Sequence, residues 1–90
     1  MKMTKHASVR AQQRAIPPQV IKWLERHGSR CHDHHGAVVY YFNTKIRRKL
    51  AECYGCERVK KLGNKLNAYI VVKGDDIITV GYRHKRIWLH

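Results

Sequence analysis

Two apolar, β-branched runs near the end of the chain are separated by only two residues. The runs are Ala68–Lys73 and Asp76–Tyr82, and Gly74 and Asp75 between them form a loop of the length that closes antiparallel hairpins. The expected pairs on one face of this hairpin are Lys73 with Asp76, Val71 with Ile78, and Tyr69 with Val80, and Tyr82 follows on that face. The chain is therefore expected to contain an antiparallel sheet.

The first third of the chain has the pattern of two helices. Residues 5–15 are expected to form the first one, which Pro17 and Pro18 end because a residue before proline avoids helical angles. A second helix starts at once, since proline is tolerated in a first turn, and Gly28 is expected to stop it. Its apolar face contains Val20, Ile21 and Leu24, with Trp23 as a further candidate. We expect these two helices to form a hairpin.

The middle of the chain is less regular. Residues 29–36 are polar and histidine-rich and are expected to be a loop, whereas residues 37–42 read as a strand that is buried on both faces or nearly so. Asn43 or Thr44 then caps a third helix, which Gly55 ends. One side of that helix carries Ile46, Leu50, Cys53 and Tyr54. The pattern of residues 56–66 does not predict a particular element, although a short helical turn that ends at Gly63 is one interpretation.

A cationic stripe runs along the first helix. His6, Arg10 and Arg14 recur every four positions and so lie one above another. They border a parallel row of small residues, namely Ala7, Ala11 and Ala15. These alanines allow close packing on a neighbouring element, which would hold the stripe at the edge of the core in an arrangement that suits a phosphate. The alternative is an ordinary solvated helix face.

The last strand also ends in cations, over the residues Tyr82, Arg83, His84, Lys85 and Arg86. A strand that is apolar at one end and cationic at the other indicates a sheet whose edge meets a polyanion. A disordered basic tail is the alternative, but the apolar residues 87–89 that follow look anchored.

The excess of basic over acidic residues indicates which classes of molecule the protein binds. The 90 residues contain 19 Lys and Arg against 6 Asp and Glu, a formal charge of +13. Nucleic acid is the leading partner for such a charge, ahead of an acidic protein; a membrane surface is the third class, since no long basic amphipathic helix with a strongly apolar face is visible. The length predicts one domain over residues 1–90.

The chain is expected to be a soluble protein of the cytoplasm. Its longest apolar run, residues 37–42, is far shorter than a membrane span, and its start has no apolar segment of signal-peptide length. Its 3 cysteines cannot all pair within the chain, which fits a reducing compartment.

Two segments together resemble a known family. They are the motif Thr4-x-His6-Ala7-x-x-Arg10-x-x-x-Arg14-x-Ile16, followed by Val20, Ile21 and Gly28, and the C-terminal residues 76–83. This pattern is similar to a family of small bacterial domains of unknown function, found alone or at the ends of polymorphic toxins and grouped with RelE-like ribonuclease toxins of the barnase, colicin and RelE type. The resemblance implies an α+β fold in which an N-terminal helical hairpin packs on one side of a small twisted antiparallel sheet, and the other side binds RNA. Residues 29–66 do not take part in the resemblance.

The residues present can support metal-independent RNA cleavage, which needs a general acid, a general base and cations around the phosphate. The candidate acid and base are His6 and His84. The expected phosphate ligands are Arg10, Arg14 and Arg83, and Tyr82 is a candidate for base stacking or for a proton relay. Further nucleic-acid contacts are expected from Lys85, Arg86, Arg48 and Lys49. No cofactor is required, and the adjacent carboxylates Asp75 and Asp76 lie in the expected turn, away from the geometry of a two-metal nuclease. The hypothesis requires the helical stripe and the end of the last strand to converge on one anion pocket.

Three alternatives remain open at this point. One is a module that binds RNA or DNA without chemistry, with residues 17–28 acting as part of a helix-turn-helix. Another is a structural protein neutralised by an acidic partner such as an antitoxin. The third adds a zinc ion, for which the ligands would be Cys31, His34, Cys53 and Cys56. Cys53 is equally explained as a small hydrophobe on the buried face of the third helix.

Overall fold

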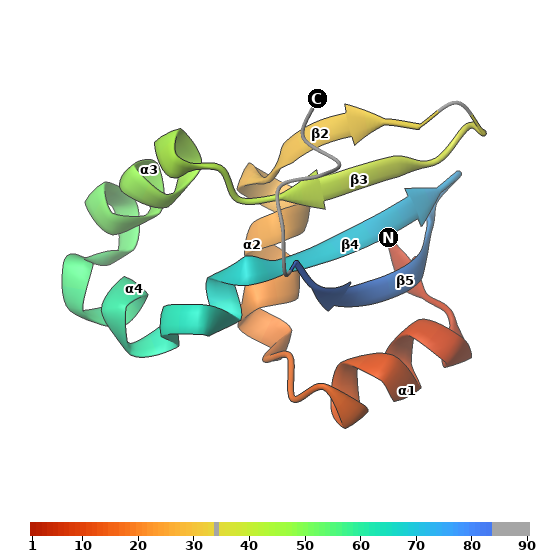
Figure 1. The fold of residues 1–90 in the computed structure, drawn as a ribbon, viewed down its shortest axis with the longest axis horizontal. Helices are drawn as coiled ribbons and strands as arrows, with labels where there is room; N and C mark the ends of the chain where they lie inside the picture. The colour runs from red at the N-terminus through yellow and green to blue at the C-terminus, as the bar shows by residue number, and fades with distance from the viewer. Residues whose placement is uncertain (34, 84–90) are drawn as a thin grey trace.

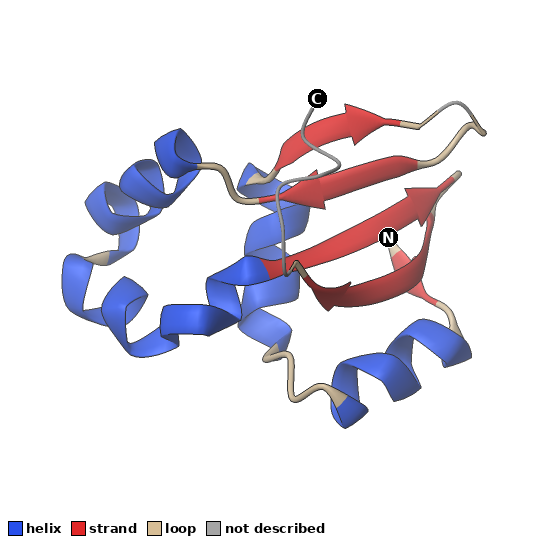
Figure 2. Cartoon of the chain, in the orientation of Figure 1, coloured by secondary structure: helices blue, strands red, loops and turns tan. Residues whose placement is uncertain are grey.

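A computed structural model describes residues 1–33 and 35–83. Within them the strands are β1 (Lys2–Met3), β2 (Ser29–His32), β3 (Val38–Tyr41), β4 (Ala68–Lys73) and β5 (Asp76–Tyr82). The helices are α1 (Lys5–Gln13), α2 (Pro18–His27), α3 (Thr44–Tyr54) and α4 (Cys56–Leu62), followed by the 3₁₀ segment η1 (Gly63–Asn67). The predicted α+β class is thereby confirmed (Figure 2).

The strands form one sheet in the order β1-β5-β4-β3-β2. The hairpin of β4 and β5 is antiparallel, as predicted, and the pairs β4–β3 and β3–β2 are antiparallel as well. Strand β1 pairs with β5 in parallel, so the sheet is mixed. The expected loop over residues 29–36 is wrong in its first half, because β2 pairs with β3 there. A polar strand at a sheet edge buries little apolar surface, so no hydrophobic pattern marked it.

The hairpin of β4 and β5 has a different register from the predicted one. Lys73 lies opposite Asp76 as expected, but a register shift between Val71 and Val72 places Val71 opposite Thr79 and Tyr69 opposite Gly81. The predicted pairs of Val71 with Ile78 and of Tyr69 with Val80 are therefore wrong. Because β5 contributes one extra residue at this bulge, Tyr82 lies opposite Ala68, on the other face of the sheet from Tyr69.

Helices α1 and α2 cover one face of this sheet. Helix α1 packs on β5, and α2 packs on β4 and β3; α2 lies behind these strands in Figure 1. The core between the layers includes the alternate β4 residues Ala68, Ile70 and Val72, and the four predicted residues of α2, which are Val20, Ile21, Trp23 and Leu24. The predicted hairpin of the two helices is not confirmed, since a groove of about 670 Å³ lies between them.

Helix α1 ends two residues earlier than predicted. Its C-cap is Arg14, and Ala15 adopts a left-handed conformation with φ 53°. The Ala15 N–H donates to the Gln12 carbonyl, and the Ile16 N–H donates to the Ala11 carbonyl, which is the pattern of a Schellman motif. Ala7 and Ala11 are buried as predicted, but Ala15 is exposed because the chain has already left the helix.

The motif makes Ala15→Gly a stabilising change. Glycine occupies the left-handed region without the steric cost of about 1–2 kcal/mol that a Cβ incurs there, and part of that gain is offset by greater freedom of the unfolded chain. We expect the free energy of unfolding to rise by about 0.5–1 kcal/mol, measured by urea denaturation. Ala51→Gly, in the interior of α3, should lower it by a similar amount. No gain for Ala15→Gly would contradict the motif.

Helices α3 and α4 form an arm beyond the ends of β3 and β4 (Figure 1). Asn43 caps α3 by accepting a hydrogen bond from the Ile46 N–H at 2.8 Å, and Gly55, with φ 98°, separates the two helices. Leu50 is buried as predicted, but Cys53 is exposed, so its assignment to the buried face is wrong. The helical turn ending at Gly63 is confirmed and belongs to the longer helix α4. In the described part of the chain, no helix has the length and apolar character needed to span a membrane.

Candidate nucleic-acid interface

The face of the sheet opposite α1 and α2 carries alternate residues of three strands. They are Val39 and Tyr41 of β3, Tyr69 and Val71 of β4, and Thr79 and Gly81 of β5, and we call this surface the open face. Successive side chains of a strand point to opposite sides, so these residues point away from the buried Ala68, Ile70 and Val72. Apart from Gly81 they are half-buried, and no helix among the described residues lies over them (Figure 1).

Two tyrosines lie side by side at one end of the open face. Tyr41 lies directly opposite Tyr69 in the antiparallel pair of β3 and β4. A Cβ placed on Gly81 would lie 2.9 Å from the hydroxyl oxygen of Tyr69 and 3.1 Å from two of its ring carbons. The Tyr69 ring therefore lies across the backbone of β5, in space that only glycine leaves open.

Arg83 borders the tyrosine pair. Its guanidinium carbon is 5.1 Å from the centroid of the Tyr41 ring, and its Nη2 donates to the Phe42 carbonyl at 2.9 Å. Its backbone N–H donates to the Asn67 carbonyl at 2.8 Å. These contacts place a permanent positive charge beside an aromatic ring at the end of the open face.

The cationic stripe of α1, formed by His6, Arg10 and Arg14, lies outside the open face. His6 and Arg14 are exposed and Arg10 is half-buried. The end of β5 contacts the residues that follow α1, because the Tyr82 hydroxyl donates to the Ala15 carbonyl at 3.2 Å. That carbonyl also accepts from Lys65 Nζ at 2.9 Å, which adds a cation that sequence reasoning missed.

The structure does not bring Arg83 to this stripe. The Arg83 side chain stacks on Tyr41 of the open face, whereas α1 packs on the opposite face of β5. Of the other predicted contacts, Arg48 and Lys49 are exposed on α3, and His84, Lys85 and Arg86 lie outside the described residues. The predicted site is thus divided into two regions, one with Tyr82 and the stripe and one with Arg83 and the open face.

The proposed zinc ligands come from separate elements. Cys31 is half-buried on β2, and Cys53 and Cys56 are exposed around the junction of α3 and α4. His34 lies outside the described residues. Within residues 1–33 and 35–83, no three His, Cys, Asp or Glu side chains are grouped so that they could hold a metal ion.

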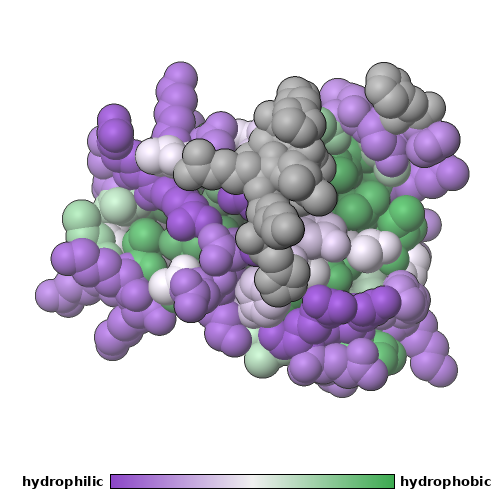
Figure 3. All heavy atoms as spheres, viewed as in Figure 1, coloured by the Kyte–Doolittle hydropathy of each residue, from purple (hydrophilic) through white to green (hydrophobic). Residues whose placement is uncertain are grey.

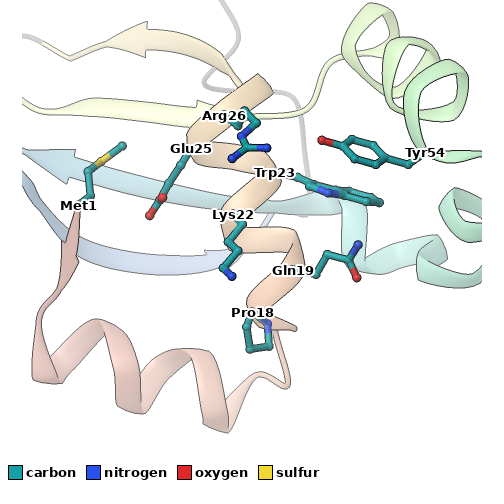
Figure 4. Close-up of a pocket in the computed structure, with 8 residues that line it drawn as sticks. All are labelled: Met1, Pro18, Gln19, Lys22, Trp23, Glu25, Arg26 and Tyr54. Carbon is teal, nitrogen blue, oxygen red and sulfur yellow. The ribbon is translucent and has the colours of Figure 1, made fainter.

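A cavity of about 870 Å³ lies on the outer side of α2 (Figure 4). Its lining combines opposite charges, Lys22 and Arg26 with Glu25, and includes none of the predicted site residues. At its margin Tyr54 stacks on Trp23 with ring centroids 4.6 Å apart, and Trp23 is only 4% exposed, so this contact serves to join α3 to α2.

A histidine of α2 adds a second contact between α2 and α3. His27 Nε2 lies 2.9 Å from the Tyr54 hydroxyl. Burial, together with the positive charges of Lys49 and Arg26, lowers the pKa of the His27 imidazole and so favours its neutral form. A neutral ring in this position is a structural hydrogen-bonding partner of Tyr54.

Sequence reasoning missed Tyr41 and Gly81 as parts of a surface, and it used Tyr69 only to set the register. The signal that could have found them is the alternation of Tyr40, which is buried, with Tyr41, which is half-buried.

Comparisons of the chain with protein-family models, with curated proteins and with solved structures found no match. The geometry of the chain itself therefore carries the functional argument.

Proposed function

We propose that the protein binds single-stranded RNA on the open face of its sheet. The observation that carries the proposal is the Tyr41–Tyr69 pair with the Arg83 guanidinium 5.1 Å from the Tyr41 ring centroid. Unstacked bases bind to proteins by stacking on aromatic rings and on arginine, and sheets with paired aromatic residues are a common platform for them.

The charge of the chain supports the same partner. A formal charge of +13 attracts a polyanion at long range, while the uncharged residues of the open face provide contacts that phosphate alone would not need. The choice of RNA over DNA rests on the resemblance of the two chain ends to the RelE-like ribonuclease toxins.

A crosslinking experiment tests the proposal. Purified protein is titrated with a fluorescent 12-nucleotide single-stranded RNA at several salt concentrations, and a 4-thiouridine version is crosslinked and mapped by mass spectrometry. We expect binding that weakens steeply with salt, and crosslinks in peptides containing Tyr41 or Tyr69. Crosslinks confined to α1 or α2, or equal affinity for duplex RNA, would refute the open face as the site.

We propose metal-independent RNA cleavage, with an acidic antitoxin as regulator, as the second candidate. The contact of Tyr82 with the Ala15 carbonyl favours it, since this contact joins the end of β5 to the residue that follows Arg14 in the chain. In this candidate His6 and His84 are the acid–base pair: one takes the proton of the attacking 2′-hydroxyl and the other protonates the departing 5′-oxygen, while Arg10 and Arg14 hold the phosphate. The same incubations, run with a metal chelator, should then yield RNA fragments that His6→Ala abolishes, and intact RNA from folded wild-type protein would exclude the cleavage.

A further inference from the structure

We propose that the arm formed by α3 and α4 is a second RNA-binding surface, which holds the phosphate backbone of nucleotides flanking those on the open face. This inference rests on the proposed function. It extends the footprint from a platform for about two bases to a longer single strand, and it assigns a role to the middle of the chain, which the family resemblance left unexplained.

The exposed side of the arm is strongly cationic. Its exposed cations are Lys45, Arg48, Lys49, Arg58, Lys60 and Lys61, whereas its exposed acids are Glu52 and Glu57. In Figure 3 hydrophilic side chains lie along the outer margin of the arm, and a less polar area lies between them. The one aromatic residue of the arm, Tyr54, is stacked on Trp23. The arm can therefore bind phosphates through charge but offers no platform for bases.

The arm is held firmly against the sheet. Arg47 Nη2 donates to the Leu66 carbonyl at 3.1 Å and to Asn67 Oδ1 at 2.6 Å. The Asn67 carbonyl in turn accepts the backbone N–H of Arg83, whose side chain stacks on Tyr41. Asn67 thus links the base of the arm to the edge of the open face. Burial lowers the pKa of the Arg47 guanidinium, as expected for a side chain inside this joint.

At the junction of α3 and α4, the arm is joined to α2 by the Trp23–Tyr54 stack and by the contact of His27 with the Tyr54 hydroxyl at 2.9 Å. Because α3 is joined to the body near both of its ends, its backbone has a fixed position relative to the two tyrosines. Such preorganisation lowers the entropic cost of binding one strand to both surfaces.

The pattern of the arm favours nucleic acid over a membrane. Its apolar residues Ile46, Leu50, Val59 and Leu62 pack toward the core. A helix that lies in a lipid interface needs an apolar side available for insertion, and here that side is already used. The long axis of the molecule measures 35 Å, which corresponds to about ten stacked nucleotides at roughly 3.4 Å each.

The experiment compares two RNA lengths and two triple variants. Affinities for a 4-nucleotide and a 15-nucleotide single-stranded RNA are measured from 50 to 300 mM salt. The arm variant is Arg48→Ala, Lys49→Ala and Arg58→Ala, all at exposed positions. The control variant removes the same charge elsewhere, by Lys22→Ala, Arg26→Ala and Lys73→Ala, which are also exposed. Circular dichroism verifies that both variants fold.

For the wild-type protein we expect the longer RNA to bind at least about tenfold more tightly and with a steeper salt dependence. The arm variant should lose about tenfold for the longer RNA, with the slope of log affinity against log salt reduced by about 2, since each phosphate contact contributes about 0.7 for a single strand. Its affinity for the 4-nucleotide RNA should be nearly unchanged. The control variant should retain the length dependence.

The remaining outcomes separate the two proposals. If the short RNA binds and crosslinks to the open face while the arm variant keeps the wild-type slope, the arm inference fails and the proposed function stands. If both triple variants lose affinity equally, the effect is one of net charge and the inference also fails. Loss of binding to phosphatidylserine vesicles by the arm variant, with RNA affinity unchanged, would make the arm a membrane surface. If neither RNA binds to the wild-type protein, both proposals fail.

Discussion

Gly28→Ala is expected to lower the free energy of unfolding by about 2–3 kcal/mol. The Gly28 N–H closes α2 by donating to the Leu24 carbonyl at 2.9 Å, and a Cβ on Gly28 would lie only 2.5 Å from that carbonyl oxygen. The clash is with backbone, so no side-chain rotation relieves it, and overpacking of this kind costs about 1–3 kcal/mol. The chain also cannot shift freely, since β2 begins at Ser29, whose Oγ accepts from Asn43 Nδ2 at 2.8 Å.

For a chain of 90 residues this loss is a large part of a total stability of roughly 5–13 kcal/mol. The melting temperature should fall by about 10–20 °C, measured by calorimetry or circular dichroism. Gly74→Asn is the control, because Gly74 has φ 63°, which asparagine tolerates, and nothing lies within 4 Å of its added Cβ. A Gly28→Ala protein that melts like the wild type would show that the end of α2 is not packed as described.

Replacing both Tyr41 and Tyr69 with alanine is expected to weaken the binding of single-stranded RNA by about 30-fold or more. Each stacked base is worth roughly 1–3 kcal/mol, so the loss of two platforms amounts to at least about 2 kcal/mol. The measurement is fluorescence anisotropy with a short RNA, which isolates the open face from the arm. The double variant with phenylalanine at both positions keeps the rings and should retain most of the affinity.

Gly81→Ala provides an independent check of the same surface. The added methyl group would push the Tyr69 ring away from β5, since the Cβ would lie 2.9 Å from its hydroxyl oxygen. The RNA affinity should fall toward that of the single Tyr69→Ala variant, although the Tyr69 side chain is still present. RNA affinity unchanged in Gly81→Ala and in the double alanine variant would place the binding site outside the open face.

Features that depend on a few neighbouring residues were predictable. The Gly74–Asp75 turn, the Asn43 cap of α3 and the apolar face of α2 were each encoded by local geometry: the conformations open to glycine, a side-chain acceptor for an orphan N–H, and helical periodicity. The cationic stripe of α1 was also placed correctly on an exposed or half-exposed surface, since helical spacing alone determines which residues share a side.

The bulge in β5 shows where such reasoning stops. Whether Val71 pairs with Ile78 or with Thr79 depends on how β4 and β5 fit the layers around them, and a slip of one residue sends every following side chain to the other face. For that reason Tyr82 contacts the end of α1, and Tyr69 lies over Gly81 on the open face. No local pattern distinguishes the two registers.

The sequence alone therefore determined the class of the fold, its main helices, the hairpin and the strong positive charge, because each follows from local conformational preference or from composition. The tertiary structure decided which charged and aromatic residues share a surface. It paired β2 with β3, placed Tyr41 beside Tyr69 and directed Arg83 away from the α1 stripe. These contacts join residues that are far apart in the chain. Their energies depend on how whole layers pack, and this packing cannot be predicted from a short segment of sequence.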